Sequence, residues 1–249
     1  VWTTIVLFFT ISLFSKWNIF KKIVSDKKKI FIVLISDFLI FVNWGVWIYA
    51  VSKDKIIDAS FGYFIMPIIS VFLGNFFFNE PITKKGKISI LLVIISVCYL
   101  LITDFTSIPW VGLIVALSWS FYNLLRKKIN VETDVGLFIE SLYILPFVLV
   151  AFYFITINNY NDFSLSDPSL MLLLMLAGPM TVIPLFLYVR GVELAGLGPA
   201  GMIFYITPTF QFLLGFFIYN EQFNINQLVS FILIWIAVFI YLKDIYEKN

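Results

Sequence analysis

Long apolar runs separated by short polar segments dominate the chain. The runs are continuous rather than alternating, and most reach the roughly 20 residues that a helix needs to cross a bilayer. Strands are excluded because an open sheet would leave unpaired backbone groups in lipid. The pattern predicts an all-α polytopic membrane protein with nine visible transmembrane helices, at residues 1–15, 29–51, 57–78, 86–103, 107–126, 135–157, 169–189, 196–219 and 224–242.

The distribution of Lys and Arg predicts the orientation. If the nine helices alternate in direction, 15 of the 17 Lys and Arg residues fall on one side, mostly in segments 16–29, 79–87 and 126–134. The other side holds Lys53 and Lys55. Because positive residues are enriched on the cytoplasmic side, the C-terminus is expected in the cytoplasm.

An internal repeat relates the two halves of the chain. Residues 59–81 align without a gap on residues 200–222, and eight of 23 positions are identical. Glu80 then falls at the cytoplasmic end of its helix and its equivalent Glu221 at the opposite face, so the two copies are inverted. Inverted repeats with Pro- or Gly-interrupted helices in matching places are typical of secondary transporters.

Inversion requires an odd number of helices in each copy. The second repeat, residues 107–249, contains five predicted helices, whereas the first, residues 1–103, contains four. We therefore expect an inverted repeat of ten helices, five in each copy. The first helix and the start of the second, about 34 residues together, are expected to be absent from this N-terminally truncated sequence.

Composition narrows the class of protein. Hydrophobic residues make up 61% of the chain and charged residues 13%, and the mean hydropathy is +0.99. These values exclude a soluble enzyme and a disordered chain, and a net charge of +2 provides no basic field for nucleic acid. With no His and a single Cys, we expect no metal site and no cofactor.

Ionisable groups inside predicted helices are functional candidates because their burial in a membrane is costly. Asp37 lies about 12 Å along its helix at 1.5 Å per residue, on the same helix as Asn43, Trp44 and Trp47. We interpret the helix face that carries Asn43, Trp44 and Trp47 as the wall of a substrate cavity. Asp37 is a candidate for proton coupling. The alternative is helix packing with Asp37 protonated or paired.

Glu140 and Arg190 are the other candidates for coupling or gating. Glu140 could pair with Arg190 or with Arg126, and a structural ion pair is the alternative interpretation. Near the centres of the repeated helices, the predicted cavity residues are Tyr63, Tyr205 and Gln211.

Prolines and glycines recur at matching places in the two copies. Pro67 and Pro208 are expected to break their helices, and Gly74 and Gly215 to allow close packing. The alternative is kinked packing without substrate contact. Glu80 and Glu221 are interpreted as caps or loop contacts rather than ligands.

A family resemblance rests on four strings, which are DASFGYFIMPIISVFLGNFFFNEP (58–81), FYNLLRKK (121–128), GLFIESLYILP (136–146) and FYITPTFQFLLGFFIYNE (204–221). Over nearly its whole length the chain resembles RarD-like proteins of the EamA family, in the drug/metabolite transporter superfamily. The resemblance implies ten helices in the bacterial inner (plasma) membrane and export of small metabolites, amino acids or drugs. Asp37 departs from the family pattern, in which a small or apolar residue is expected, so the resemblance gives it no role.

The leading hypothesis is therefore a secondary transporter, a permease working by alternating access of the two repeats. Its expected partners are the lipid bilayer, a small-molecule substrate and protons, with no nucleic acid. A non-transporting membrane scaffold is the alternative. An intramembrane enzyme ranks lower because no paired acids, metal site or activated nucleophile is visible, and a channel ranks low because no ring of like charges appears.

Overall fold

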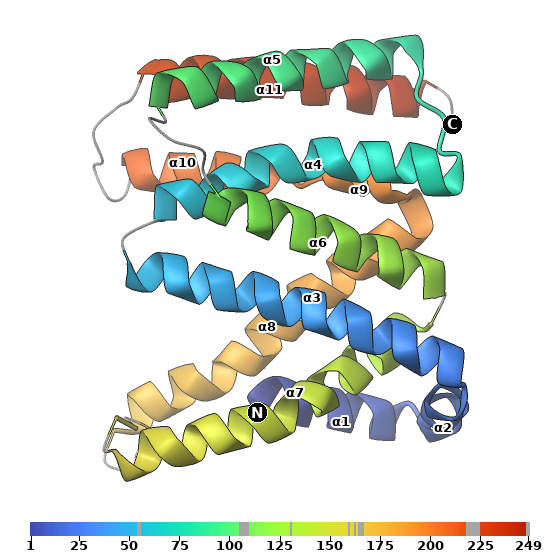
Figure 1. Cartoon of the computed structure of the whole chain (residues 1–249), viewed down its shortest axis with the longest axis vertical. Coiled ribbons are helices and arrows are strands. Elements are labelled where there is room, and N and C mark those ends of the chain that lie inside the picture. Colours follow the sequence, from blue (N-terminus) through green and yellow to red (C-terminus); the bar gives the residue numbers. More distant parts are fainter. Residues whose placement is uncertain are drawn as a thin grey trace. The chain divides into compact units, whose positions relative to one another are not determined.

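The computed structural model describes residues 1–53, 56–104, 110–129, 131–158, 160–161, 163, 167–217 and 225–247. Within these residues the chain forms helices and no strand (Figure 1). The helices are α1 (Trp2–Leu13), α2 (Trp17–Ser25), α3 (Lys27–Ser52), α4 (Ile56–Phe78), α5 (Lys84–Asp104), α6 (Trp110–Ile129), α7 (Thr133–Ile157), α8 (Pro168–Ala195), α9 (Leu197–Ile203), α10 (Ile206–Phe217) and α11 (Ile225–Tyr246).

Helix length and hydropathy identify a membrane protein. Among the described residues, five helices are long and apolar enough to cross a bilayer, or six if the bent pair α1–α2 counts as one crossing. Many large apolar side chains of these helices are exposed, which only lipid or other protein can cover. The structure thus supports the all-α membrane class, whereas the number of nine helices stays a prediction.

Two local features differ from the predicted pattern. The first is α2, which lies in a segment that the sequence suggested to be a polar connection and bends from α1 by 112°. Its rings Trp17 and Phe20 pack against Phe138 with centroids 5.9 and 5.6 Å apart, while Lys21 and Lys22 stay exposed. A short amphipathic helix can therefore form between two apolar runs.

The second difference concerns the two prolines that were expected to break their helices: the predicted helix 196–219 is interrupted just before Pro208, but α4 is not interrupted at Pro67. The chain leaves α9 at Phe204 and Tyr205 and restarts as α10 at Ile206, so that Pro208 lies in the first turn of α10. Proline has no N–H, which the first turn of a helix does not need. In contrast, α4 continues through Pro67 without interruption.

Two compact units divide the described chain, and each takes residues from both sequence halves. Unit 1 is Val1–Phe41 with Leu125–Leu194, and unit 2 is Val42–Leu124 with Ala195–Asn249. Lys55, Lys248, Asn220 and Glu221, on which parts of the sequence predictions depend, lie outside the described residues.

In unit 1, α1 packs along α7 (Figure 1). Leu7 and Ile11 of α1 join Val33 of α3 and residues of α7 and α8 in one buried apolar cluster. The backbone of α1 comes so close to α8 at Gly178 that a Cβ atom there would lie 2.9 Å from the carbonyl carbon of Trp2. This packing fixes the positions of the buried charged residues described below.

In unit 2, two helix pairs form the core. The helices α5 and α11 lie side by side (Figure 1), with Val93 and Ile234 buried between them and the Ser96 hydroxyl donating to the Ser230 carbonyl at 2.9 Å. The helix α4 packs along α9, where a Cβ atom at Gly201 would lie 2.8 Å from the Cβ of Ser70.

Candidate functional site

Unit 1 buries a cluster of charged side chains contributed by three helices. Asp37 of α3 is 6% exposed, Glu140 of α7 is 4% exposed and Arg126, in the last turn of α6, is 1% exposed. Glu140 Oε1 lies 3.4 Å from Arg126 Nη1 and 3.1 Å from the Ser36 hydroxyl. The structure therefore selects Arg126, rather than Arg190, as the partner of Glu140.

A glycine makes room for the buried guanidinium. A Cβ atom at Gly136 would lie 1.9 Å from Arg126 Nη1, so the guanidinium lies directly against the backbone of α7. Arg126 Nη2 also donates to the Thr133 carbonyl at 3.2 Å. Because a side chain at position 136 would occupy the place of Arg126, glycine is required here by the available space.

Asp37 has a different environment from Glu140. Its Oδ1 atom is buried and has no hydrogen-bond partner among the described residues. Its main electrostatic neighbour is Glu140, which has the same sign of charge. The sequence suggested that Asp37 is either a coupling residue or a protonated or paired packing residue, and no cation within the described residues pairs with it.

Arg190 lies apart from this buried contact. Its side chain is 52% exposed and pairs with Glu193 at 3.1 Å, one turn along α8. Glu193 also accepts a hydrogen bond of 2.7 Å from the Thr133 hydroxyl. Within the part of the chain that the structure describes, Arg190 therefore connects to α7 through Glu193 and Thr133.

In unit 2, the predicted cavity residues separate into packed and half-buried side chains. Asn43 is buried, and its amide donates to the Val115 carbonyl at 2.9 Å and to the Ser118 hydroxyl at 3.0 Å. These bonds join α3 to α6, so the polar atoms of Asn43 serve helix packing. Trp44, in contrast, is 45% exposed.

A chain of aromatic rings lies beside Asn43. The rings of Trp47 and Tyr63 are 5.3 Å apart, those of Tyr63 and Phe204 are 5.7 Å apart, and those of Phe204 and Trp119 are 6.0 Å apart. All four side chains are only half-buried. Such rings offer stacking surface for an organic molecule.

Tyr205 is fully enclosed by its neighbours. Its hydroxyl donates to the Phe64 carbonyl at 2.8 Å, so it joins the break between α9 and α10 to the middle of α4. Gln211 and Gly215 lie in α10, and their side-chain positions are outside the described residues. The prediction that Gln211 lines a cavity stays untested.

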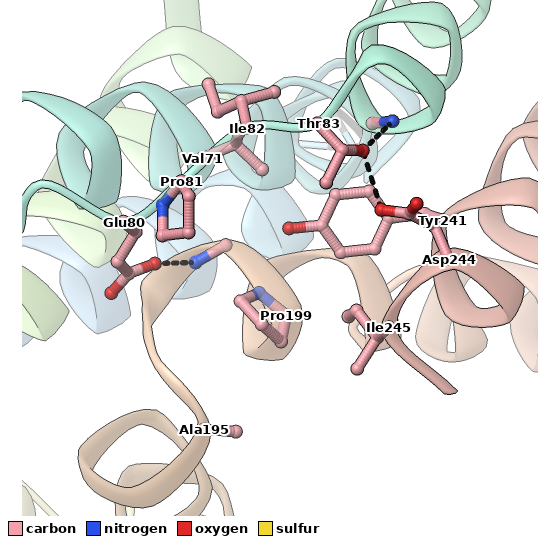
Figure 2. A pocket seen from close by; sticks show the side chains of 12 residues that line it. Val71, Glu80, Pro81, Ile82, Thr83, Ala195, Pro199, Tyr241, Asp244 and Ile245 are labelled. Atoms are coloured by element: carbon pink, nitrogen blue, oxygen red, sulfur yellow. Dashed lines mark hydrogen bonds between the residues drawn. The ribbon is translucent and has the colours of Figure 1, made fainter. Parts of the chain in front are cut away.

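A pocket of about 200 Å³ lies at the ends of α4 and α11 (Figure 2). Glu80 accepts backbone N–H bonds of 2.9 Å from Leu197 and from Gly198, at the start of α9. Thr83 donates to Asp244 at 2.6 Å, and the ring of Tyr241 reaches into the pocket from α11 (Figure 2). The pocket is therefore built around helix-end contacts, as the interpretation of Glu80 as a cap expects.

Three glycines give the Glu80 carboxylate its space. Cβ atoms at Gly74, Gly196 and Gly198 would lie 2.4, 2.8 and 3.4 Å from its oxygen atoms. Gly196 also has φ +102°, a conformation that side chains rarely adopt. Gly74 thus permits a close approach, and the approaching groups are the Glu80 carboxylate and the side chain of Leu197.

Several of these residues escaped the sequence reasoning as members of a site. Ser36, Trp119 and Gly136 carry no charge or repeat signal, and Arg126 was considered only as one of two possible partners of Glu140. For the aromatic chain, the available sequence signal was that Tyr63 and Phe204 occupy equivalent positions of the repeat.

Comparison with known proteins identifies the family. The model of the EamA-like transporter family matches residues 1–102 and 106–243. The chain belongs to the EamA-like transporter family. This EamA protein is 33% identical to Protein RarD of Escherichia coli, over 98% of its own length and 82% of the length of the relative.

Two further relatives come from other bacteria. An uncharacterized transporter, YojE of Bacillus subtilis, is 31% identical over 97% of this chain and 81% of its own length. The chloramphenicol-sensitive protein RarD of Pseudomonas aeruginosa is 28% identical over 80% of this chain and 66% of its own length. The resemblance to RarD-like proteins is thereby confirmed.

Proposed function

We propose that this EamA protein is a secondary transporter that exports small organic metabolites, amino acids or drugs by alternating access of two inverted repeats. Family membership supports transport, and the Bacillus subtilis relative is named an uncharacterized transporter. The substrate class and the direction of transport are our inference from the resemblance and the predicted orientation.

The observation that carries the proposal is contact between equivalent residues of the two copies. Phe64 and Tyr205 are 141 residues apart and are joined by a hydrogen bond. Tyr63 and Phe204 have the same separation and touch through their rings. Contacts of this kind are expected where a two-fold axis relates two copies of one unit.

The bounds of the helices support the same relation. The helices α3 and α5 begin at Lys27 and Lys84, and α8 and α11 begin 141 residues later, at Pro168 and Ile225. The packed pairs α4–α9 and α5–α11 also join equivalent segments. A duplicated unit of this kind gives a transporter two arrangements of similar energy, which alternating access requires.

The aromatic chain is the proposed contact surface for the substrate. Trp47, Tyr63 and Phe204 present half-buried rings next to the predicted two-fold axis, which suits a flat or apolar organic molecule. Asn43 and Tyr205 already use their polar groups in packing, so we assign them the role of holding this surface in place.

Transport into everted membrane vesicles tests the proposal. Vesicles from cells that express the complete gene are given radiolabelled amino acids and radiolabelled chloramphenicol, and uptake is compared with vesicles that lack the protein. We expect faster accumulation of at least one probe. No accumulation of any probe under a proton or sodium gradient would contradict the proposal and favour a non-transporting scaffold.

A variant of the aromatic chain makes the test specific. Replacing Trp47 by Ala removes a ring contact worth about 1 kcal/mol, and the apparent affinity for the transported probe is expected to fall about fivefold. Phe76→Ala is the matched control, because Phe76 lies on α4 but is 79% exposed. An equal loss of apparent affinity in Trp47→Ala and Phe76→Ala would exclude a specific role of Trp47.

A further inference from the structure

Unit 1 buries two carboxylates and one guanidinium. Asp37, Glu140 and Arg126 are each more than nine-tenths buried, and they come from α3, α7 and the end of α6. Glu140 lies 3.4 Å from Arg126 and within hydrogen-bond distance of Ser36. The one cation of the cluster is therefore engaged by Glu140.

Asp37 faces this occupied pair with a buried oxygen that has no hydrogen-bond partner among the described residues. If both acids were ionised, the three residues would carry one net negative charge out of contact with water. A buried carboxylate without a partner is unfavourable, and two neighbouring acids with one counter-charge hold one proton between them at lowest cost.

The other charged groups of unit 1 do not remove this imbalance. Asp134 of α7 pairs with Lys16 at 2.6 Å, and Glu193 of α8 bonds with Thr133 and Arg190. No charged residue lies in α1. Lys29 of α3 and Lys127 of α6 are half-buried, and the exposed cations of α2, α3 and α6 are Lys21, Lys22, Lys27, Lys28 and Lys128.

We propose that Asp37 and Glu140 form a proton-binding site, with Arg126 as the fixed counter-charge. This inference rests on the proposed transport function and deepens it by naming the coupling ion. Loading adds one proton to a carboxylate oxygen and forms an O–H bond, and release breaks that bond and returns the proton to water. A metal cation is disfavoured because Arg126 already places a positive charge beside Glu140.

The structure also assigns different roles to the two acids. Glu140 is held by Arg126 and Ser36, so it is the fixed member of the pair. Asp37 is the member whose oxygen lacks a fixed donor, so it is the acid that takes up and releases the proton. A proton bound here neutralises the cluster, and its release leaves one negative charge.

Infrared spectroscopy of the purified protein tests the site without a substrate. The carbonyl stretch of a protonated carboxyl group is expected at neutral pH in the wild-type protein and should disappear at alkaline pH. In Asp37→Asn that band is lost. In Glu140→Gln the negative charge beside Asp37 is removed while Asp37 stays buried, so the band should remain but disappear at a lower pH than in the wild-type protein.

Asp134→Asn is the matched control. Asp134 is also buried in unit 1, but its carboxylate pairs with Lys16, so its replacement should leave the band unchanged. A wild-type protein without a titrating carboxyl band would overturn the proposal. Retention of the complete band in a folded Asp37→Asn variant would also overturn it.

Transport by the same variants separates this inference from the proposed function. For a probe that the wild-type vesicles accumulate, an imposed proton gradient should accelerate uptake, and Asp37→Asn should abolish the acceleration while exchange of labelled for unlabelled probe continues. Accumulation that follows a sodium gradient and ignores pH would overturn the proton site but leave the transporter assignment standing. If the carboxyl band titrates but no probe is transported, the proton site would stand and the transporter assignment would be overturned.

Discussion

At the residue scale, two of the contacts that charged side chains make among the described residues depend on glycine. Arg126 lies against the backbone of Gly136, and the Glu80 carboxylate is enclosed by Gly74 and Gly196. A charged group that leaves water needs donors or acceptors within about 3 Å. A neighbouring Cβ atom would occupy that space, so residues without a side chain are needed beside the charge.

Replacement of Gly136 by Ala tests this requirement. The new methyl group would lie 1.9 Å from Arg126 Nη1 and displace the guanidinium from Glu140. Overpacking of this kind typically costs about 1–3 kcal/mol, and the separated ion pair adds to the loss. We expect a lower midpoint of thermal unfolding in detergent, measured by intrinsic fluorescence.

Gly191→Ala is the control for that experiment. Gly191 lies in α8, and a Cβ atom there meets nothing within 4 Å. Alanine favours the helical conformation by up to about 1 kcal/mol over glycine. The control should therefore unfold at the wild-type temperature or slightly above it, and equal stability of the two variants would argue against close packing at Gly136.

At the scale of elements, short helices depend on contacts from other helices. The helix α9 has seven residues, fewer than an isolated helix needs for stability in water. Its N-terminal N–H groups bond to Glu80, which follows α4, and its C-terminal end is joined to α4 by Tyr205. The position of α9 is thus determined by α4 at both ends.

Glu80→Gln should weaken the first of these contacts. The amide can accept one N–H bond, but its NH₂ group then faces the second backbone donor, at Gly198. Loss of a charge-assisted hydrogen bond costs about 1.5–3 kcal/mol. The expected result is a lower unfolding midpoint and faster amide hydrogen exchange in α9.

Glu247→Gln provides the comparison, because Glu247 pairs with Lys85 at an exposed position. Ion pairs between exposed side chains contribute little to stability because solvent screens them. Hydrogen exchange in α9 should match the wild-type protein in this variant. If Glu80→Gln behaved in the same way, Glu80 would not be a cap of α9.

Tyr205→Phe should weaken the second contact of α9. The variant keeps the ring but removes the hydroxyl that donates to the Phe64 carbonyl, at a cost of about 0.5–1.5 kcal/mol. Thermal unfolding measures the loss. Tyr153→Phe, at an exposed position of α7, should show no change, and an equal effect of both substitutions would contradict the role of the bond.

At the scale of the whole molecule, the predicted orientation follows from charge. The cytoplasmic face is expected to carry the C-terminus, because most Lys and Arg residues fall on that side when the helices alternate. Arg126 was counted in that distribution, but its burial with Glu140 shows that it also has a structural role.

Reporter fusions test this orientation. Alkaline phosphatase fused after Asn249 is expected to be inactive, because the enzyme needs the oxidising periplasm to form its disulfides. The same reporter fused after Asn161 should be active. A fluorescent protein at the two positions should give the reverse pattern, and equal phosphatase activity at both positions would contradict the predicted alternation of helices.

The sequence by itself determined where the apolar helices form and which family the chain belongs to. Each predicted apolar run contains a helix in the described residues, because the length and hydropathy of a run are properties of consecutive residues. The candidates Asp37 and Glu140 were also visible, since a charged residue within an apolar run is recognisable without any partner.

Only the tertiary structure decided which groups meet. The choice of Arg126 over Arg190 by Glu140, the bonds of Asn43 to α6 and the cap that Glu80 gives to α9 each join segments far apart in the chain. Hydrogen bonds and ion pairs act over about 3–4 Å in space. Separation along the sequence does not fix that distance, so the packing of the helices determines the partners.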